Sequence, residues 1–338
     1  MKVLLTGSTG FVGRNVLLEL LKQQKYEVIY LPVRSEAKLR QQLMEEGFLE
    51  FPEVLKPLVM EAPNWDFSHL GVIDHVVHSA GVLFGNSLED YMRTNTEGTL
   101  RLMQTVSTPN KIVILSSQAA SGPCVGAQDY KTEQDQNRPL TWYGSSKLQM
   151  EQTVQAKFPQ MNVVFLRPPM ILGGRDTATL PLFKMANGIV QIKPGFKKKQ
   201  YSFVAVQDLV GAIIQVLQSE FSLSALPQKY FFVASDQVIT DIDLIKTTTG
   251  LMNKKGRLIF IPEFLIWMAS QIISVIPSLT KALPSLSRDR AKEIWPNKWV
   301  VSSHSFEKQF SWKAKVDLKG ALTDTLDWYV KSGQLIVK

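Results

Sequence analysis

A strand, a loop with three glycines and a helix follow one another at the N-terminus, and this order limits the possible folds more than any other feature of the chain. The apolar run Val3–Thr6 predicts the strand, and the apolar spacing after Gly13 is that of a helix. The loop between them contains Gly7, Gly10 and Gly13. Backbone N–H groups of such a loop, together with the helix dipole, attract a pyrophosphate. Two residues lie between the first two glycines, one more than in the usual dinucleotide fingerprint. We nevertheless predict a dinucleotide site here.

Strands and helices are predicted to alternate along most of the chain, which is typical of a doubly wound α/β domain with a parallel sheet, the Rossmann fold. Such sheets bind ligands at the carboxyl ends of their strands. Gly7, Arg34, Ala80 and Ser117 all lie just beyond a predicted strand end, so one crevice can gather them. The predicted strands are Val3–Thr6, Glu27–Leu31, Leu58–Glu61, His75–His78, Ile112–Ser116, Asn162–Arg167 and Lys229–Val233, and the predicted helices are Gly13–Gln23, Ser35–Glu46, Leu88–Val106, Tyr143–Ala156 and Val206–Leu217.

Tyr143 and Lys147 stand four residues apart at the start of a predicted helix, so their side chains share one face of that helix. A free phenol titrates near about pH 10, whereas a catalytic acid or base works best near the operating pH. A cation about 4 Å away lowers a phenol pKa by about three units, at an effective dielectric near ~20. The pair therefore predicts a tyrosine acid or base activated by Lys147. The same spacing is common on solvated helix surfaces, and the other motifs distinguish the two interpretations.

Further motifs follow in order along the chain. Asn95-Thr96-Glu97-Gly98-Thr99 lies in a predicted helix, Ser116-Ser117 ends one apolar strand, and Arg167-Pro168-Pro169 ends another. Together with the glycine loop and the Tyr143–Lys147 pair, this series resembles the extended short-chain dehydrogenase/reductase family, within the NAD(P)-dependent epimerase/dehydratase superfamily. Ser116-Ser117-x-x-x-x-Gly122-Pro123 is most similar to its branch of 3β-hydroxysteroid dehydrogenases and dihydroflavonol reductases. The matches extend to about residue 215, and the remaining third of the chain matches loosely.

The resemblance implies a catalytic role for four side chains. Tyr143 is expected to protonate a carbonyl oxygen as general acid while a nicotinamide delivers hydride to the carbon. Lys147 is expected to lower the tyrosine pKa and to hold the nicotinamide ribose. Ser117 is expected to hydrogen-bond the same oxygen, and Asn95 to connect Lys147 to a proton-relay water.

The resemblance also implies a nicotinamide cofactor bound by the glycine loop and by the ends of several strands. Arg34 follows the second strand, with no Asp or Glu before Glu36. An acidic residue at that place selects NAD, whereas an arginine pairs with a 2′-phosphate. NADP(H) is therefore favoured over NAD(H), although the loop Val59–Ala62 departs from the family's Gly-Asp pattern. The predicted cofactor-binding residues are Thr6, Gly7, Thr9, Gly10, Phe11, Val12, Gly13, Arg34, Ser35, Ser79, Ala80, Gly81, Ser116, Tyr143, Lys147, Arg167, Pro168, Pro169 and Met170.

Residues 1–170, together with about 200–235, are expected to form the dinucleotide-binding core, and residues 171–338 mainly a substrate-binding lobe interleaved with it. From residue 181 onward there are 21 Lys and Arg against 12 Asp and Glu, a net charge of +9 in a chain whose total is +8. An anionic substrate, an anionic membrane and solvent alone are all compatible with such a surface. No nucleic-acid-binding motif accompanies the charge, so nucleic acid is not an expected partner.

One cysteine in 338 residues, Cys124, excludes an intramolecular disulfide and indicates a reducing compartment. We expect no signal peptide, because Met1–Thr6 already belongs to the first strand. No apolar run reaches the ~18–20 residues of a membrane span, so a cytoplasmic protein is expected. Four histidines without metal-ligand spacing predict no metal site, and His78 is interpreted as a packed core residue.

We predict an NADP(H)-dependent oxidoreductase that reduces a ketone or an aldehyde to an alcohol, or catalyses the reverse reaction. A nucleotide-sugar epimerase or dehydratase of the same family and a non-catalytic dinucleotide-sensing regulator are the alternatives. Whether the small-molecule substrate is anionic or lipid-like stays open. The apolar run Phe264–Met268 either lines a lipid-sized pocket or packs between helices, and packing is the simpler interpretation. The resemblance also implies a homodimer formed by the helices that contain Asn95 and Tyr143.

Overall fold

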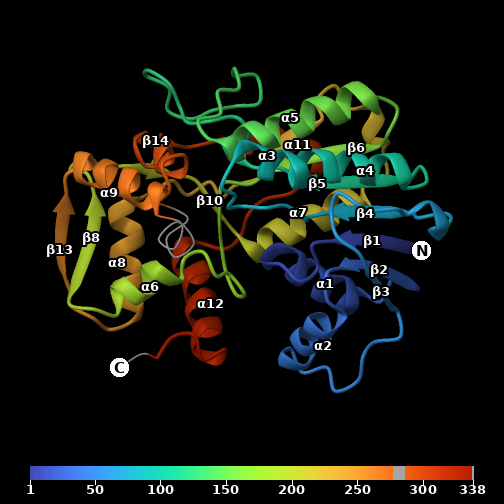
Figure 1. Cartoon of the computed structure of the whole chain (residues 1–338), viewed down its shortest axis with the longest axis horizontal. Coiled ribbons are helices and arrows are strands. Elements are labelled where there is room, and N and C mark those ends of the chain that lie inside the picture. The colour runs from blue at the N-terminus through green and yellow to red at the C-terminus, as the bar shows by residue number, and fades with distance from the viewer. Residues whose placement is uncertain (277–285, 337–338) are drawn as a thin grey trace.

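A parallel sheet of seven strands forms the centre of the molecule in the computed structural model, which describes residues 1–276 and 286–336 (Figure 1). The strand order is β11-β6-β5-β4-β1-β2-β3, so the chain leaves β1 in one direction and returns through β4 in the other. This reversal is the topological switch point, where doubly wound sheets open a crevice for ligands. The predicted α/β class is confirmed. The strands are β1 (Lys2–Thr6), β2 (Val28–Val33), β3 (Leu55–Val59), β4 (His75–His78), β5 (Lys111–Leu115), β6 (Val163–Arg167) and β11 (Tyr230–Phe232).

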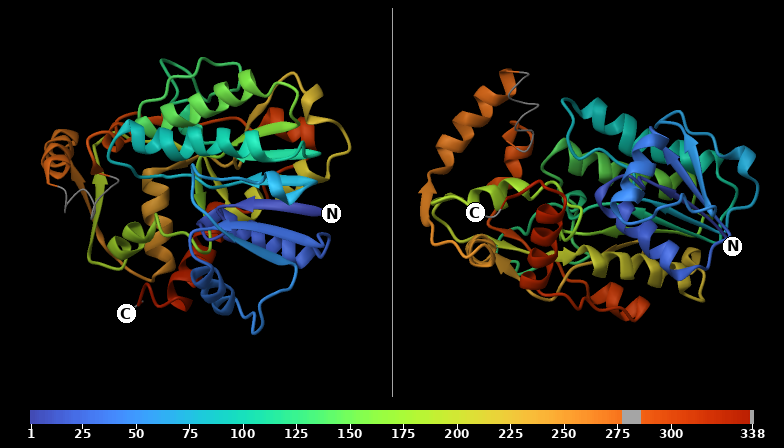
Figure 2. Two further views of the ribbon diagram at one scale, coloured as in Figure 1. Left: turned by 45° about the vertical axis from the view of Figure 1, so that its right-hand side comes forward. Right: turned by 90° about the horizontal axis from the view of Figure 1, so that it is seen from below.

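Helices cover both faces of this sheet, as the views in Figures 1 and 2 show. Apolar residues of α1, α2 and α7 share one buried cluster with the sheet, and those of α4 and α5 share a second cluster on the opposite face. The three-layer arrangement follows from strands that are apolar on both sides. The helices of this core are α1 (Phe11–Gln23), α2 (Glu36–Glu45), α3 (Leu88–Tyr91), α4 (Gly98–Thr105), α5 (Trp142–Lys157) and α7 (Val206–Gln218).

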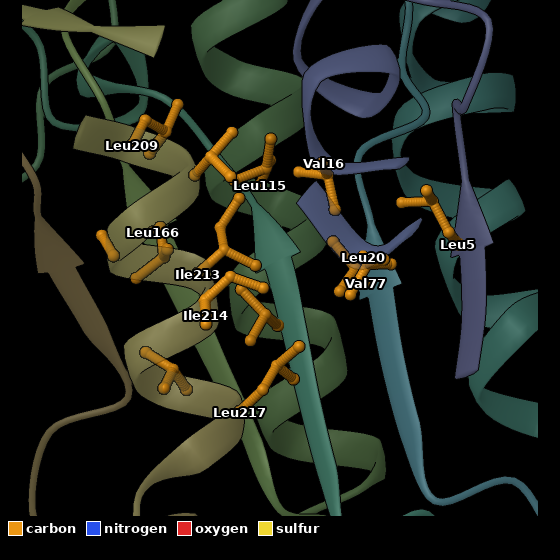
Figure 3. Packing of buried hydrophobic residues seen from close by; sticks show 14 of the residues in the cluster. Leu5, Val16, Leu20, Val77, Leu115, Leu166, Leu209, Ile213, Ile214 and Leu217 are labelled. Carbon is orange, nitrogen blue, oxygen red and sulfur yellow. The ribbon is translucent and has the colours of Figure 1, made fainter. Parts of the chain in front are cut away.

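Close packing of aliphatic side chains joins the helices to the sheet. In Figure 3, Val16 and Leu20 of α1 and Ile213 of α7 point toward side chains of the central strands. All three are at most 1% exposed. Burying a side chain of this size contributes about 1.5–3 kcal/mol relative to exposure, so this interface is a main source of stability.

Two elements differ from the sequence prediction. The predicted helix Leu88–Val106 is divided into α3, a π-helical turn (η2, Met92–Glu97) and α4. Thr99 Oγ1 donates to the carbonyl oxygen of Asn95 at 2.7 Å in this region, a side-chain bond that competes with regular helical pairing. The predicted strand Leu58–Glu61 instead starts at Leu55, because the edge position of β3 tolerates Pro57.

The C-terminal half of the chain builds a lobe of small sheets and helices beside the core. Its apolar centre contains Leu172, Phe183, Phe203, Leu322 and Tyr329. The lobe elements are β7 (Met170–Leu172), α6 (Leu180–Ala186), β8 (Val190–Pro194), β9 (Gln200–Tyr201), β10 (Phe203–Ala205), β12 (Ile239–Thr240), α8 (Asp241–Leu251), β13 (Arg257–Ile261), α9 (Glu263–Val275), η6 (Arg290–Ile294), β14 (Lys298–Trp299) and α12 (Leu318–Lys331).

The lobe and the core are interleaved along the chain. Residues 206–232 return to the core as α7 and β11, and α11 (His304–Phe310) packs against β11. Residues 277–285 and 337–338 of the predicted lobe lie outside the described residues. Among the residues that the structure describes, no helix is long and apolar enough to cross a membrane.

Candidate active site

The glycine loop packs so closely against the end of β4 that side chains do not fit. Gly7 has a φ of +74°, and a Cβ on it would lie 2.7 Å from the backbone nitrogen of Ala80. A Cβ on Gly13 would lie 2.1 Å from the carbonyl oxygen of Gly7. Both distances are far below van der Waals contact, so glycine is required at these two positions.

The N-terminus of α1 is open for an anionic ligand. Gly10 is its N-cap residue, and no side chain caps the first turn. Phe11, Val12 and Gly13 line the adjacent cavity, so the first backbone N–H groups of the helix lie along its wall. Helix N–H groups and the positive end of the helix dipole favour phosphate oxygens. The loop therefore fits the diphosphate of a dinucleotide.

A cavity of about 570 Å³ extends from the glycine loop to the lobe. Fourteen of the predicted site residues line it, and they come from both halves of the core sheet. They are Gly7, Gly10, Phe11, Val12, Gly13, Ser79, Gly81, Ser116, Ser117, Tyr143, Lys147, Pro168, Pro169 and Met170. The predicted residues outside this lining are Thr6, Thr9, Arg34, Ser35, Ala80, Asn95 and Arg167.

Tyr143 stands in the first turn of α5, where the Thr141 side chain accepts a hydrogen bond from Gly144 N and caps the helix. Burial raises the pKa of Tyr143, while a hydrogen bond with the Ser117 side chain and the charge of Arg290 lower it. The net direction is upward, so the phenol is held protonated. The hydroxyl groups of Tyr143 and Ser117 thus meet on one wall of the cavity, as the motifs predict.

Lys147 lies in α5 one helical turn after Tyr143, and its side chain contacts the end of β5. Its Nζ donates to the carbonyl oxygen of Leu115, the last residue of β5, at 2.9 Å. Burial lowers the pKa of Lys147 to about 8, with the Glu151 carboxylate acting in the opposite direction. The charges that lower the pKa of Tyr143 include that of Arg290, and an effect of Lys147 on the phenol stays a prediction.

Arg290 and Glu293 are the site residues that sequence reasoning missed. The Arg290 guanidinium lies 5.2 Å from the centre of the Tyr143 ring, and its Nη1 pairs with Glu293 Oε1 at 2.8 Å. Thr141 Oγ1 also donates to Glu293 Oε1, at 2.8 Å, which ties η6 to the start of α5. Both residues line the cavity, and burial raises the pKa of Glu293. No spacing signals them, since about 150 residues separate η6 from Tyr143 in the chain.

Three buried polar atoms of the cavity wall have no hydrogen-bond partner among the residues that the structure describes. They are Ser116 Oγ, Gln118 Nε2 and Arg290 Nε. An unpaired buried donor costs about 1–3 kcal/mol, so native structures satisfy such groups with water or a ligand. The three atoms therefore mark places where polar groups of a bound molecule fit.

A comparison with known protein families shows which family the chain belongs to. Residues 3–225 match the family described as "NAD dependent epimerase/dehydratase family". The chain belongs to this family. Its members are NAD-dependent enzymes, and the resemblance drawn from the motifs is confirmed.

Individual relatives of this epimerase/dehydratase family member include both reductases and epimerases. Ceramide reductase of Caulobacter vibrioides (strain NA1000 / CB15N) is 25% identical over 341 residues, covering 98% of this chain and 96% of that protein. UDP-glucose 4-epimerase of Vibrio cholerae is 25% identical over 264 residues, covering 75% and 76%. Among solved structures, UDP-Glucuronic acid 4-epimerase from Bacillus cereus in complex with UDP-Glucuronic acid and NAD has a TM-score of 0.77 at 17% identity, over 99% of this chain and 100% of that one. This last likeness shows the shared fold.

Asn95 lies beside the site of this family member without lining the cavity. It is fully buried in the π-helical turn, and its Oδ1 accepts a hydrogen bond from Val82 N at 2.8 Å. Its Nδ2 donates to Ser146 Oγ at 3.0 Å. A Cβ on Gly81 would lie 2.9 Å from Asn95 Oδ1 and 3.2 Å from Lys147 Nζ, so all three residues are close. The amide positions the loop after β4 next to Lys147.

Arg167 and Thr6 have structural contacts. Arg167 is fully buried, and its guanidinium forms two hydrogen bonds with Glu151, at 2.9 and 2.5 Å, and stacks 4.0 Å from the Tyr230 ring. Its side chain therefore points away from the cavity, which leaves only the backbone of this segment for a cofactor. Thr6 Oγ1 bonds with Nδ1 of the buried His78 at 2.7 Å, so His78 is a packed histidine as interpreted.

Arg34 and Ser35 lie just beyond β2. Arg34 is exposed, and its Nη1 lies 3.9 Å from Glu61 Oε1. Ser35 accepts a hydrogen bond from Lys38 N and caps α2. In the described residues, no group of three or more His, Cys, Asp and Glu side chains is arranged to bind a metal ion.

Proposed function

We propose that this chain interconverts a carbonyl compound and an alcohol with a nicotinamide cofactor. One observation carries the proposal: the hydroxyl groups of Tyr143 and Ser117 share a cavity wall with the open N-terminus of α1. A proton donor and a dinucleotide site thus adjoin the same space. The match to a ceramide reductase over 98% of this chain supports a reductase over a regulator. The presence of Ser117 and Tyr143, to which we assign the substrate oxygen and the proton, supports the same choice.

In this proposal the protein's own residues handle the proton and the substrate oxygen. The Tyr143 phenol carries the proton that a carbonyl oxygen accepts during reduction, and the Ser117 hydrogen bond and the charge of Arg290 act against burial to lower its pKa toward the operating pH. The Ser117 hydroxyl donates a second hydrogen bond to that oxygen and stabilises its developing negative charge. The nicotinamide, when bound, supplies or accepts the hydride.

Lys147 has a holding role in the same scheme. One of its three donors is used by the carbonyl oxygen of Leu115, and the ammonium lines the cavity. We propose that the other donors bind the nicotinamide ribose, and that Asn95 positions Lys147 through the loop at Gly81. The segment 168–170 contributes backbone groups to the same ligand.

We propose NADP(H) as the preferred cofactor. Arg34 is exposed after β2, and the chain has no Asp or Glu between Val28 and Ser35 that would select a ribose 2′-hydroxyl. Glu61 beside Arg34 opposes a phosphate and moderates the preference. The ratio of the NADH and NADPH dissociation constants tests this point: Arg34→Ala should lower the preference for NADPH about tenfold, and an unchanged ratio would reject the assignment.

A second candidate is epimerisation of a nucleotide sugar. Arg290 lines the cavity with an unpaired Nε, which suits an anionic group of such a substrate, and a UDP-glucose 4-epimerase matches three quarters of the chain. The neutral Gln118 beside Ser117 is against the related dehydratase chemistry, since it cannot act as an acid or base.

A substrate panel separates the two candidates. The purified chain is incubated with NADPH and short aldehydes, aromatic ketones, long-chain ketones or ceramide, while NADPH absorbance is followed. Parallel samples contain UDP-glucose and NAD, with sugar products separated by chromatography. Consumption of NADPH with a carbonyl substrate, and transfer of deuterium from labelled cofactor to carbon, is the expected result. Sugar epimerisation without net cofactor turnover would instead establish the second candidate.

We also propose that the chain forms a homodimer through α4 and α5, the helices next to Asn95 and Tyr143. Sedimentation at micromolar concentration tests it directly. A monomer at every concentration would reject the dimer.

A further inference from the structure

The end of the lobe farthest from β3 has its apolar side chains on the outside. This end consists of β8, β13 and α9, which lie together at the left edge of Figure 1. In β8, Val190 and Ile192 are exposed, whereas Gln191 and Lys193 are 2% and 0% exposed. A strand with one solvated face normally shows the opposite alternation. The outer face of this small sheet is therefore built like an inner one.

Helix α9 has the same inverted pattern. Phe264, Trp267, Met268 and Ile272 are exposed, Trp267 by 54%, while Ser270 is only 1% exposed. The Ser270 hydroxyl donates to the carbonyl oxygen of Trp267 at 2.7 Å, which satisfies it on the buried side. No charged residue follows Glu263 within the helix. A helix that faces water has its polar residues outward, so this orientation indicates a contact other than water.

These side chains correct the sequence interpretation of the run 264–268. Packing between helices was the simpler expectation, and lining of a pocket was the other. Phe264, Leu265, Trp267 and Met268 are exposed, and none of them lines the cavity at Tyr143. The apolar run belongs to the outer surface.

Basic residues surround the apolar surface. Lys197 and Lys198 follow Phe196, whose ring stacks on Phe260 with centroids 6.1 Å apart. Arg257, at the start of β13, pairs in register with the exposed Val190, and Lys255 is exposed just before it. The one acidic residue in the segments 189–198 and 255–275 is Glu263, which forms an ion pair with the buried Lys199 at 3.0 Å. The rim of this surface is therefore positive.

We propose that this apolar-basic face docks on the surface of an anionic lipid bilayer. Its apolar residues are Val190, Ile192, Phe196, Ile259, Phe264, Trp267, Met268 and Ile272, and the basic residues around them are Lys197, Lys198, Lys255 and Arg257. Apolar and aromatic side chains next to basic ones are the pattern of elements that lie in a membrane interface. With 13 residues, α9 is too short to span a bilayer, which takes about 20.

Charge decides between a membrane and a second copy of the chain. Two copies joined by this face would bring their basic residues close together, and these would repel one another. Anionic lipid headgroups instead attract the same residues. Each Lys or Arg near an anionic membrane surface strengthens binding about fivefold. The docking is independent of the reaction proposed for the cavity, so either can fail without the other.

Vesicle flotation of the full chain tests the proposal. Vesicles of phosphatidylcholine alone are compared with vesicles that also contain phosphatidylglycerol, at low and high salt. Binding to the anionic vesicles is expected, with weaker binding to neutral ones and at high salt. Lys197→Gln with Lys198→Gln should weaken anionic binding at least tenfold, whereas the control Lys22→Gln with Lys157→Gln, two exposed lysines of the core, should leave it unchanged.

Apolar substitutions provide the second arm. Phe264→Ser with Trp267→Ser should weaken binding at least about tenfold. Leu49→Ser with Val72→Ser, at two core positions that are even more exposed, should not. Brominated lipids should quench part of the tryptophan fluorescence, and Trp267→Phe, which keeps the apolar character, should abolish that part. This variant keeps the test valid even where the double serine variant fails to fold.

Three results would overturn the proposal. They are equal binding to neutral and anionic vesicles, unchanged binding of the lysine variant, and a dimer that Trp267→Ser converts to monomer in sedimentation. The last result would assign the face to a second copy of the chain.

Discussion

The core and the apolar-basic face of the lobe follow opposite patterns on their outer surfaces. In the core, α7 directs Leu209, Ile213 and Leu217 inward, all at most 3% exposed. At the far end of the lobe, β8 and α9 direct apolar side chains outward and keep Gln191, Lys193 and Ser270 inside. The core thus buries its apolar side chains, whereas the far end of the lobe exposes them.

The inner sides of both regions are nevertheless organised alike. In the core, Arg167 is satisfied by Glu151 and by Asn137. In the lobe, Lys193 forms an ion pair with Asp241 at 2.8 Å and donates to the carbonyl oxygens of Gly195 and Lys197. Buried charges with full sets of partners are required wherever the chain excludes water. The two regions therefore pair their buried charges in the same way and differ in which side chains they expose.

The largest effect is expected at the core site. Tyr143→Phe removes the proposed proton donor and should lower kcat roughly 10²- to 10⁴-fold, while NADPH binding, measured by fluorescence titration, stays within about twofold. Tyr130→Phe, at an exposed tyrosine, is the matched control. A Tyr143→Phe enzyme with an unchanged kcat would refute the assignment of Tyr143 as the proton donor.

Breaking a buried ion pair should be costly in both regions. Arg167→Met leaves Glu151 charged and buried, and Lys193→Met does the same to Asp241, so each should lower the free energy of unfolding by about 3–5 kcal/mol. Urea denaturation measures both, and Arg40→Met, at an exposed pair, should change stability by less than about 1 kcal/mol.

A double variant checks the cause of the loss. Arg167→Met with Glu151→Leu removes both charges and should recover most of the stability. If Lys193→Met were as mild as Arg40→Met, the inner side of the lobe would not resemble the core.

Acid should destabilise the core through His78. Burial lowers the pKa of His78 to about 3, below its ordinary value, and the nearby Lys147 acts in the same direction. Between pH ~6.5 and about 3 the unfolded chain then binds more protons than the native one. Each unit by which the pH is lowered in that window therefore reduces the free energy of unfolding by about 1.4 kcal/mol. Comparing wild type with His78→Gln by urea denaturation isolates this contribution. Parallel pH profiles of the two would contradict it.

The smallest effect is expected on the apolar-basic face. Ile213→Ala in α7 should lower the free energy of unfolding by about 3 kcal/mol, because it opens a cavity in the core. Ile272→Ala in α9, where the isoleucine is 54% exposed, should change it by less than about 0.5 kcal/mol. Equal losses at the two sites would mean that Ile272 is buried in solution, against the inverted orientation of α9.

Most elements of the core could be predicted because their patterns are local. β4 has the predicted bounds, and the ends of α1, α5 and α7 differ from the predicted ones by at most two residues. The shift of β3 and the π-helical turn at Asn95 were missed, since one depends on Pro57 lying at a sheet edge and the other on threonine side-chain bonds. Of the residues grouped by their place at strand ends, Gly7 and Ser117 line one cavity, whereas Arg34 and Ala80 lie outside its lining.

The sequence by itself determined the fold class through the alternating periods of strands and helices. The order of its motifs, from the glycine loop to Tyr143, gave the resemblance to the family. Only the tertiary structure brought Arg290 over the phenol, turned Lys147 toward Leu115, buried Arg167 and exposed Trp267. These outcomes depend on contacts between segments far apart in the chain and on which face of an element meets water. Local periodicity identifies the two faces of a helix, but packing decides which one is inside.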